Sequence, residues 1–137
     1  MLDCLIMGDS IAVGVSHAQP KCVAYAKGGI NSKAFNETYV KGRKSDFGAE
    51  VVIISLGSND GGVGVKTYNE LYKLREHVKA ERVYWVLPNP ERFPRQADDV
   101  NLIAISFGDQ ILKTNRYQED KVHPTVAGYK ELAKSAE

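Results

Sequence analysis

Four short segments of the chain contain residue types that could cleave or transfer an acyl group. The first, Gly8-Asp9-Ser10, supplies a hydroxyl, and the third, Gly57-Ser58-Asn59-Asp60, supplies a side-chain amide. Gly28-Gly29 lies between them, and Asp120-Lys121-Val122-His123-Pro124 places a carboxylate three residues before an imidazole. A serine hydroxyl attacks a carbonyl carbon when a base takes its proton, and imidazole suits that task near neutral pH.

Each residue type fits one step of ester cleavage by a serine. Ser10 would attack the carbonyl carbon, His123 would accept the proton, and Asp120 would hold the imidazole in one tautomer. The oxyanion that forms needs preorganised donors, which the backbone N–H groups of Ser10 and Gly29 and the Asn59 amide could supply. We therefore predict a catalytic triad of Ser10, His123 and Asp120, and an oxyanion hole of Ser10, Gly29 and Asn59.

The hydrophobic pattern predicts the elements that would bring these segments together. Apolar runs of strand length cover 2–7, 22–26, 51–56 and 83–87, with a weaker candidate at 110–114. Because the runs are continuous rather than alternating, they favour strands buried on both faces of a parallel sheet. Helical patterns cover 11–18, 31–40, 67–80, 97–107 and 125–136.

This alternation of strands and helices predicts the α/β class, with helices on both faces of an open sheet. Ligands of such sheets bind at the carboxyl ends of the strands, where the four segments fall. Local signals mark helix ends: Thr67 is the expected N-cap with Glu70 at the capping-box position, Thr125 is a similar cap, and Gly108 can end a helix.

Each segment taken alone also has a purely structural interpretation. Ser10 could be an N-cap, and Asn59-Asp60 could form a turn. Asp120 and His123 could begin a helix, or bind a metal for which no third ligand is evident. Four segments in order, each at a predicted strand end, favour the catalytic interpretation.

Length and charge bound the function further. A chain of 137 residues suggests a single domain over 1–137, and 18 basic against 17 acidic residues give a net charge of +1. This balance argues against a protein built for nucleic acid, although a local basic patch stays open. No apolar run could span a membrane, and no signal-peptide pattern is visible, so we expect a cytoplasmic protein. The oligomeric state cannot be predicted.

The two cysteines, Cys4 and Cys22, lie in separate apolar stretches without histidine or cysteine partners nearby. Buried, reduced thiols are the favoured interpretation, in keeping with a cytoplasmic protein. A bridge between them would be possible if the two stretches formed neighbouring strands.

In order and position, the four segments resemble the sequence blocks of the SGNH (GDSL-like) hydrolase family. Gly8-Asp9-Ser10 resembles the first block, Gly29 the second, Gly57-Ser58-Asn59-Asp60 the third and Asp120 to Pro124 the last. Gly29 is preferred to its neighbour Gly28 because the four residues that begin at Gly29 are closer to the family's local pattern.

The resemblance spans 8–124 and implies a flavodoxin-like, three-layer α/β/α sandwich with a five-stranded parallel sheet. By position it implies Ser10 as nucleophile, Asp120 and His123 as the rest of the triad, and Gly29 and Asn59 as oxyanion donors. It further implies hydrolysis of esters, often acetyl groups on carbohydrate, without a metal or an organic cofactor.

The chain departs from longer family members in ways that bear on the substrate. The stretch from Asp60 to Thr67 is short, and little follows the last helix, so little chain is left for a lid or a deep acyl channel. We therefore expect a serine esterase for short-chain esters, acetyl above all. The alternatives are a non-catalytic carbohydrate-binding module of the same fold, a lysophospholipase or thioesterase, and a nucleotide-binding flavodoxin-like protein.

One further loop, Pro88 to Arg95, follows the fourth predicted strand at the functional edge. Arg92 or Arg95 could contact an anionic or hydroxyl-rich substrate, and Phe93 could stack on a sugar. A solvated connector with Phe93 packed on the core is an equally good interpretation.

Overall fold

The computed structural model describes residues 2–62 and 64–137 and is built on a five-stranded parallel sheet in the order β2-β1-β3-β4-β5. The strands are β1 Leu2–Gly8, β2 Val23–Ala26, β3 Phe47–Ser55, β4 Val78–Val86 and β5 Gln110–Leu112. This is the flavodoxin-like order, in which β2 is added on one side of β1 and β3 on the other, so that the strand order reverses between β1 and β3. The predicted parallel sheet and its strand number are confirmed.

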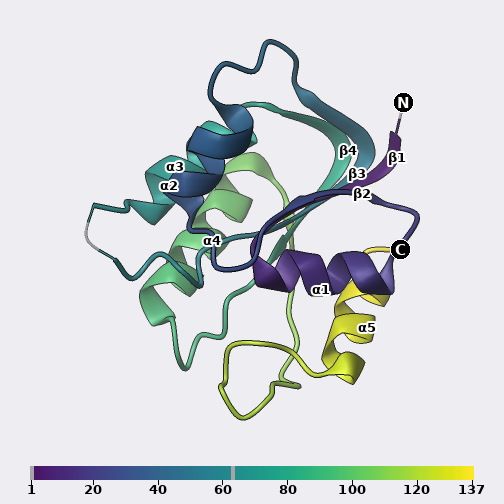
Figure 1. Ribbon diagram of the computed structural model, residues 1–137, viewed down its shortest axis with the longest axis vertical. Coiled ribbons are helices and arrows are strands. Elements are labelled where there is room, and N and C mark those ends of the chain that lie inside the picture. The colour runs from purple at the N-terminus through teal and green to yellow at the C-terminus, as the bar shows by residue number, and fades with distance from the viewer. Residues whose placement is uncertain (1, 63) are drawn as a thin grey trace.

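Helices cover both faces of the sheet, which gives three layers (Figure 1). One face is covered by α1 Ser10–Ala18 and α5 Val126–Ser135. The other is covered by α2 Ser32–Phe35, the π-helix η1 Asn36–Val40, α3 Thr67–Arg75 and α4 Pro94–Phe107. Each face has its own apolar core, because the buried residues of every central strand point alternately to the two helical layers. The predicted three-layer α/β/α sandwich is confirmed.

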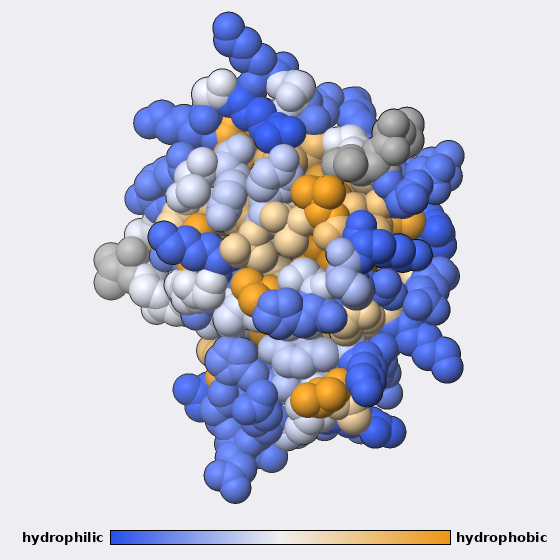
Figure 2. All heavy atoms as spheres, turned by 45° about the vertical axis from the view of Figure 1, so that its right-hand side comes forward, coloured by the Kyte–Doolittle hydropathy of each residue, from blue (hydrophilic) through white to orange (hydrophobic). Residues whose placement is uncertain are grey.

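The surface carries few large apolar side chains. Figure 2 shows one face, on which hydrophilic residues surround a central apolar patch. The exposed large apolar residues of the described chain are Val23, Tyr72, Leu102, Ile105 and Val126. No helix in residues 2–62 and 64–137 has the length and apolar character needed to cross a membrane.

The predicted helix over 67–80 is too long at its carboxyl end. Helix α3 ends at Arg75, and β4 begins at Val78, whose backbone pairs with Phe47 of β3. Val78 follows Leu74 at helical spacing, so its apolar side chain fits both patterns, and pairing with the sheet decides between them. The candidate over 31–40 is also modified, because it divides into α2 and the π-helix η1.

The cysteines form a disulfide, which corrects the expectation of reduced thiols. Cys22 immediately precedes β2, and the parallel register pairs Leu5 with Val23, so Cys4 and Cys22 face each other with their Cα atoms 4.9 Å apart. This separation lies within the range that a disulfide requires. Disulfides persist mainly in oxidising compartments, so the bridge does not support the cytoplasmic location expected from the sequence.

Helices α1 and α5 pack closely against each other. A Cβ atom placed on Gly14 of α1 would lie 2.2 Å from the ring of Tyr129 on α5. Gly128 is similarly enclosed, since its Cβ would lie 2.6 Å from the Arg116 carbonyl oxygen. These glycines bring the helix that begins at Ser10 close to the segment that precedes α5, which contains His123.

Candidate active site

The structure brings Ser10, His123 and Asp120 together in a hydrogen-bonded series. Ser10 Oγ lies 2.9 Å from His123 Nε2, and His123 Nδ1 lies 2.6 Å from Asp120 Oδ2. Both distances are within the reach expected of a nucleophile, its base and the group that orients the base. The His123 and Asp120 side chains are 37% and 45% exposed, so the series opens to solvent.

Ser10 reaches this position because β1 ends abruptly and α1 begins at once. Gly8 has φ +141°, and a Cβ there would lie 1.8 Å from the Ser55 carbonyl oxygen, so only glycine fits. The Asp9 carboxylate caps α1 by accepting from the N–H groups of Ile11 and Ala12 at 3.0 and 3.4 Å. Asp9, rather than Ser10, is therefore the N-cap, and the Ser10 hydroxyl stays available to His123.

The turn that carries Asp120 and His123 is held by its own backbone and side chains. Asp120 Oδ1 accepts from the N–H groups of Val122 and His123 at 2.9 and 3.0 Å. The hydrogen bond from His123, followed by these backbone bonds, lowers the pKa of the Asp120 carboxyl to about 2. Asp120 is thus an ionised acceptor at neutral pH and favours the His123 tautomer that leaves Nε2 free to take a proton from Ser10.

The predicted oxyanion donors lie on three neighbouring loops. Ser10 N–H is at the start of α1. Among the loop and turn hydrogen bonds of residues 2–62 and 64–137, neither Ser10 N–H nor Gly29 N–H donates to a backbone carbonyl. Gly29 has φ +77°, and a Cβ on the adjacent Gly28 would lie 3.9 Å from Ser10 Cβ, which places this loop against the nucleophile. Asn59 Nδ2 donates to the Ile30 carbonyl oxygen at 3.1 Å. The other hydrogen of this amide has no partner in the described residues and could bind an oxyanion. The oxyanion-binding role of Ser10, Gly29 and Asn59 stays a prediction.

Asp60 holds two of these loops together, a part that sequence reasoning missed. Its carboxylate is 3% exposed and accepts from Ser32 N–H, Ser32 Oγ and Thr67 Oγ1 at 2.8, 2.6 and 2.9 Å. The expected cap of α3 is therefore wrong: Lys66 is the N-cap position without a side-chain bond, and Thr67 donates to Asp60 instead. An aspartate beside a candidate oxyanion donor was the only signal for this role.

Asn89 is a second residue whose role the sequence did not reveal. It is 5% exposed, and its Nδ2 donates to the Lys121 carbonyl oxygen at 2.8 Å while its Oδ1 accepts from Glu91 N–H at 3.1 Å. The loop after β4 is thereby tied to the turn between Asp120 and His123. Lys121 has φ +61°, the one positive φ found outside glycine in the described residues, and the bond to Asn89 helps to hold it.

The Asp9 carboxylate adds a second electrostatic feature beside the nucleophile. Asp9 is 1% exposed, and burial raises the pKa of its carboxyl to about 6, against the lowering effect of its hydrogen bonds from Ile11 and Ser55. Asp9 Oδ2 has no hydrogen-bond partner in the described residues, so nothing compensates a charge on that oxygen.

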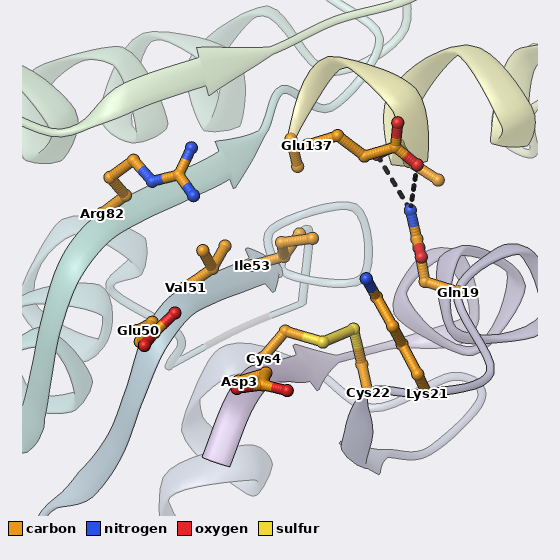
Figure 3. A pocket seen from close by; sticks show the side chains of 12 residues that line it. Asp3, Cys4, Gln19, Lys21, Cys22, Glu50, Val51, Ile53, Arg82 and Glu137 are labelled. Atoms are coloured by element: carbon orange, nitrogen blue, oxygen red, sulfur yellow. Dashed lines mark hydrogen bonds between the residues drawn. A yellow bond between two sulfur atoms is a disulfide. The ribbon is translucent and has the colours of Figure 1, made fainter. Parts of the chain in front are cut away.

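A separate hollow of about 410 Å³ lies away from these residues, beside the disulfide (Figure 3). Its walls include the side chains of Val51 and Ile53, with Lys21 and Arg82 extending from opposite sides. Neither Ser10, His123 nor Asp120 lines it, and its two cysteines are bonded to each other. The hydroxyl and imidazole needed for acyl chemistry are thus found at the other site. In residues 2–62 and 64–137 no three His, Cys, Asp or Glu residues are grouped to hold a metal ion.

Comparison with solved structures gives clear likenesses, whereas no family model and no curated protein matches the sequence. A member of the lipolytic protein G-D-S-L family from Veillonella parvula is 16% identical to this chain, with a TM-score of 0.69. The match covers 99% of this chain and 96% of the Veillonella chain. A putative acylhydrolase from Bacteroides fragilis is 18% identical with a TM-score of 0.64, covering 97% and 83%.

A third likeness is to the C-terminal catalytic domain of peptidoglycan O-acetyltransferase A from Streptococcus pneumoniae. It is 17% identical with a TM-score of 0.64, and the match covers 97% of this chain and 89% of that domain. At identities this low, the three likenesses establish a shared fold. The fold implied by the SGNH resemblance is therefore confirmed on structural grounds.

Proposed function

We propose that this chain is an SGNH-type serine esterase that removes short acyl groups, acetyl above all, from alcohols such as those of carbohydrates. The observation that supports this best is the series Ser10 Oγ, His123 Nε2, His123 Nδ1 and Asp120 Oδ2, with links of 2.9 and 2.6 Å. The series lies at the carboxyl edge of the sheet, beside the loops that contain Gly29 and Asn59.

In the first half of the proposed reaction, Ser10 Oγ attacks the ester carbonyl carbon while its proton passes to His123 Nε2. The carbonyl oxygen becomes an oxyanion, which accepts hydrogen bonds from Ser10 N–H, Gly29 N–H and the Asn59 amide. The C–O bond to the alcohol then breaks, and His123 returns the proton to the leaving oxygen. The products are the free alcohol and an acylated Ser10.

In the second half, water replaces the alcohol. His123 Nε2 takes a proton from the water as its oxygen attacks the acyl carbon, and the same donors hold the second oxyanion. The bond to Ser10 Oγ breaks, and the proton returns to Ser10, which releases the carboxylic acid. Asp120 stays ionised throughout and stabilises the imidazolium of His123.

The exposed triad supports a short acyl group and a large alcohol. With His123 and Asp120 both more than one third exposed, the side of the site on which the alcohol would lie is open to solvent. The stretch from Asp60 to Thr67, next to the predicted oxyanion donor Asn59, is short and leaves little chain to bury a long acyl group, whereas acetyl needs little burial. One structural neighbour is named a peptidoglycan O-acetyltransferase, which is in keeping with acetyl as the acyl group.

A binding module that only retains this fold is the principal alternative. It would need no hydrogen-bonded nucleophile and base, yet both links of the series are within catalytic distance. Measurable glycan binding without any turnover of p-nitrophenyl acetate would favour the binding module.

The experiment that tests the proposal is labelling with a fluorophosphonate, together with hydrolysis of p-nitrophenyl acetate. We expect label on the wild type, no label on Ser10→Ala, and loss of nearly all hydrolysis in that variant. Ser16→Ala is the matched control, because Ser16 lies on the same helix but donates to the Val13 carbonyl oxygen at 2.6 Å. Folded wild-type protein that takes no label would contradict the assignment of Ser10 as nucleophile.

A further inference from the structure

An open hollow of about 520 Å³ adjoins the turn that carries the triad residues of the last block. It is lined by Glu91, Arg92 and Phe93 from the loop after β4 and by Lys121 from that turn. Its two sides are joined by the bond from the buried Asn89 amide to the Lys121 carbonyl oxygen. The hollow is therefore formed by two loops that hold each other, rather than by one surface loop.

The charges in this hollow are unbalanced. Arg92 and Lys121 are exposed cations, and neither forms an ion pair with a carboxylate within residues 2–62 and 64–137. Arg92 instead lies over the half-buried Phe93 ring, with 5.7 Å between the guanidinium carbon and the ring centre. Glu91 is the one carboxylate in the lining, so the hollow has a net charge of +1.

The position of the hollow relates it to the leaving group of the reaction. Lys121 is bonded to Asp120, so its Cα lies about 3.8 Å from the Cα of the residue that orients His123. In a serine-histidine mechanism the imidazole returns its proton to the leaving oxygen, so the alcohol lies on the side of His123. The predicted oxyanion donors Gly29 and Asn59 belong to other loops.

We propose that this hollow binds a carboxylate on the alcohol half of the ester, so that the preferred substrate is an acetylated sugar acid. This inference rests on the esterase function proposed above and adds the chemical class of the alcohol. Arg92 and Lys121 would bind the carboxylate, Phe93 would pack on the apolar face of the sugar ring, and Glu91 would accept a hydroxyl hydrogen.

Glu91 also distinguishes between anions. The lining has a net charge of +1, so a bound carboxylate with one negative charge would bring the total to zero. A phosphate with two negative charges would bring the total to about −1. The lining therefore matches a carboxylate better than a phosphate.

The test compares three acetyl esters that differ in one group: methyl glucuronide, methyl glucoside and methyl glucoside 6-phosphate, each mono-O-acetylated. We expect kcat/KM of the wild type to be about tenfold higher for the glucuronide than for the glucoside, a typical effect of a charge-assisted hydrogen bond. Lys121→Gln and Arg92→Gln should each remove most of this ratio, mainly by raising KM for the glucuronide. Lys79→Gln, a control at the opposite end of β4, should leave the ratio unchanged.

Three outcomes would overturn the inference. The first is an equal kcat/KM for glucuronide and glucoside, and the second is a preference that survives both substitutions. The third is a higher kcat/KM for the phosphate ester than for the glucuronide, lost in Lys121→Gln and Arg92→Gln. This result would show that the hollow prefers a phosphate to a carboxylate.

The inference can fail separately from the esterase function. Wild type that hydrolyses p-nitrophenyl acetate without any preference among the sugars would overturn only the inference. If no ester is cleaved, binding of free methyl glucuronide to Ser10→Ala is measured by NMR against methyl glucoside. Tighter binding of the glucuronide that Lys121→Gln abolishes would support the hollow as a carboxylate site, and equal binding would overturn it.

Discussion

Two carboxylates near the nucleophile have opposite electrostatic environments. Asp120 is exposed and accepts three hydrogen bonds, so the pKa of its carboxyl falls to about 2. Asp9 is buried, has an oxygen without a partner, and has its pKa raised to about 6. Such a separation between neighbouring carboxyl groups is typical of sites in which the two do different work. Here Asp120 is suited to orient a base, and Asp9 to shape the helix start at Ser10.

Replacing Asp120 with asparagine tests the orienting role. Asparagine keeps the shape of the side chain but cannot stabilise the His123 imidazolium, and it can favour the wrong tautomer. We expect kcat for p-nitrophenyl acetate to fall by about 10⁴-fold, as for the equivalent change in a serine protease triad. Glu119→Gln, next to it in the sequence, is the control and should keep wild-type kcat. A fall of less than tenfold in Asp120→Asn would contradict the role.

Asp9 predicts a dependence of stability on pH. Its carboxyl has a pKa near 3.8 in the unfolded chain and about 6 in the folded protein, so the folded state binds the proton more tightly. The free energy of unfolding should therefore fall as pH rises from about 4 to about 6, by about 3 kcal/mol.

The measurement is urea unfolding between pH 4 and pH 7. Asp9→Asn keeps an acceptor for the start of α1 but has no carboxyl, so this fall should be absent from it. Asp46→Asn, at an exposed position, should retain the wild-type profile. An identical pH profile for wild type and Asp9→Asn would show that Asp9 does not titrate in this range.

At the scale of elements, the site depends on loops that are fastened to one another. Asp60 joins the loop after β3 to the start of α2 and α3, and Asn89 joins the loop after β4 to the turn before α5. Both side chains are nearly fully buried, and each satisfies groups from segments that are distant in sequence. These bonds hold the exposed loops that contain Asn59 and His123 in place.

Asp60→Ala tests this fastening. The change leaves Ser32 N–H, Ser32 Oγ and Thr67 Oγ1 without their buried acceptor, at a cost of about 3 kcal/mol in the free energy of unfolding. Because Asn59 is the adjacent residue, kcat for p-nitrophenyl acetate should fall at least about tenfold in protein that remains folded.

Thr67→Val is the matched comparison for this element. It removes one of the three donors and keeps the shape of the side chain, so we expect a loss of about 1 kcal/mol and a smaller fall in kcat. Urea unfolding and initial rates check both variants. Equal stability of wild type and Asp60→Ala would contradict the fastening role.

At the scale of the whole molecule, the disulfide joins β1, which leads to Ser10, to the residue before β2, which leads to Gly29. Cys4 and Cys22 are 18 residues apart, and closing a loop of this length stabilises a protein by about 3 kcal/mol. We expect dithiothreitol to lower the free energy of unfolding of the wild type by about that amount. The double variant Cys4→Ala, Cys22→Ala is the control and should not respond to the reductant. Unchanged wild-type stability after complete reduction would contradict this expectation.

The open carboxyl edge predicts the preference for acyl length. Since the short stretch from Asp60 to Thr67 leaves little chain to cover an acyl group, added methylene groups gain little burial. We expect kcat/KM to fall from acetate to butyrate to octanoate esters of p-nitrophenol. A rising series would instead indicate an apolar channel and favour the lysophospholipase or thioesterase alternative.

The parts of this molecule that local chemistry controls could be predicted. Continuous apolar runs are typical of strands in a parallel sheet, so the sheet could be predicted from them, and Gly108 and Thr125 end and begin helices as expected. The expected burial on both faces is wrong for the run over 22–26, because it forms the edge strand β2 with Val23 exposed. The start of β4 could not be predicted. Val78 fits helical spacing from Leu74, and only pairing with Phe47 of β3 makes it part of the sheet.

The sequence by itself determined the α/β class, the order of the strands, and the placement of Ser10, Asn59, Asp120 and His123 after their carboxyl ends, because apolar runs and turn residues act over short distances. Only the tertiary structure decided the Cys4–Cys22 bridge, the cap by Asp9 and the bonds of Asp60 and Asn89. The bridge and the bonds of Asp60 and Asn89 join groups that are distant in sequence. The cap could have been either Asp9 or its neighbour Ser10. Such choices depend on strand register and burial, which the packing of the whole chain sets.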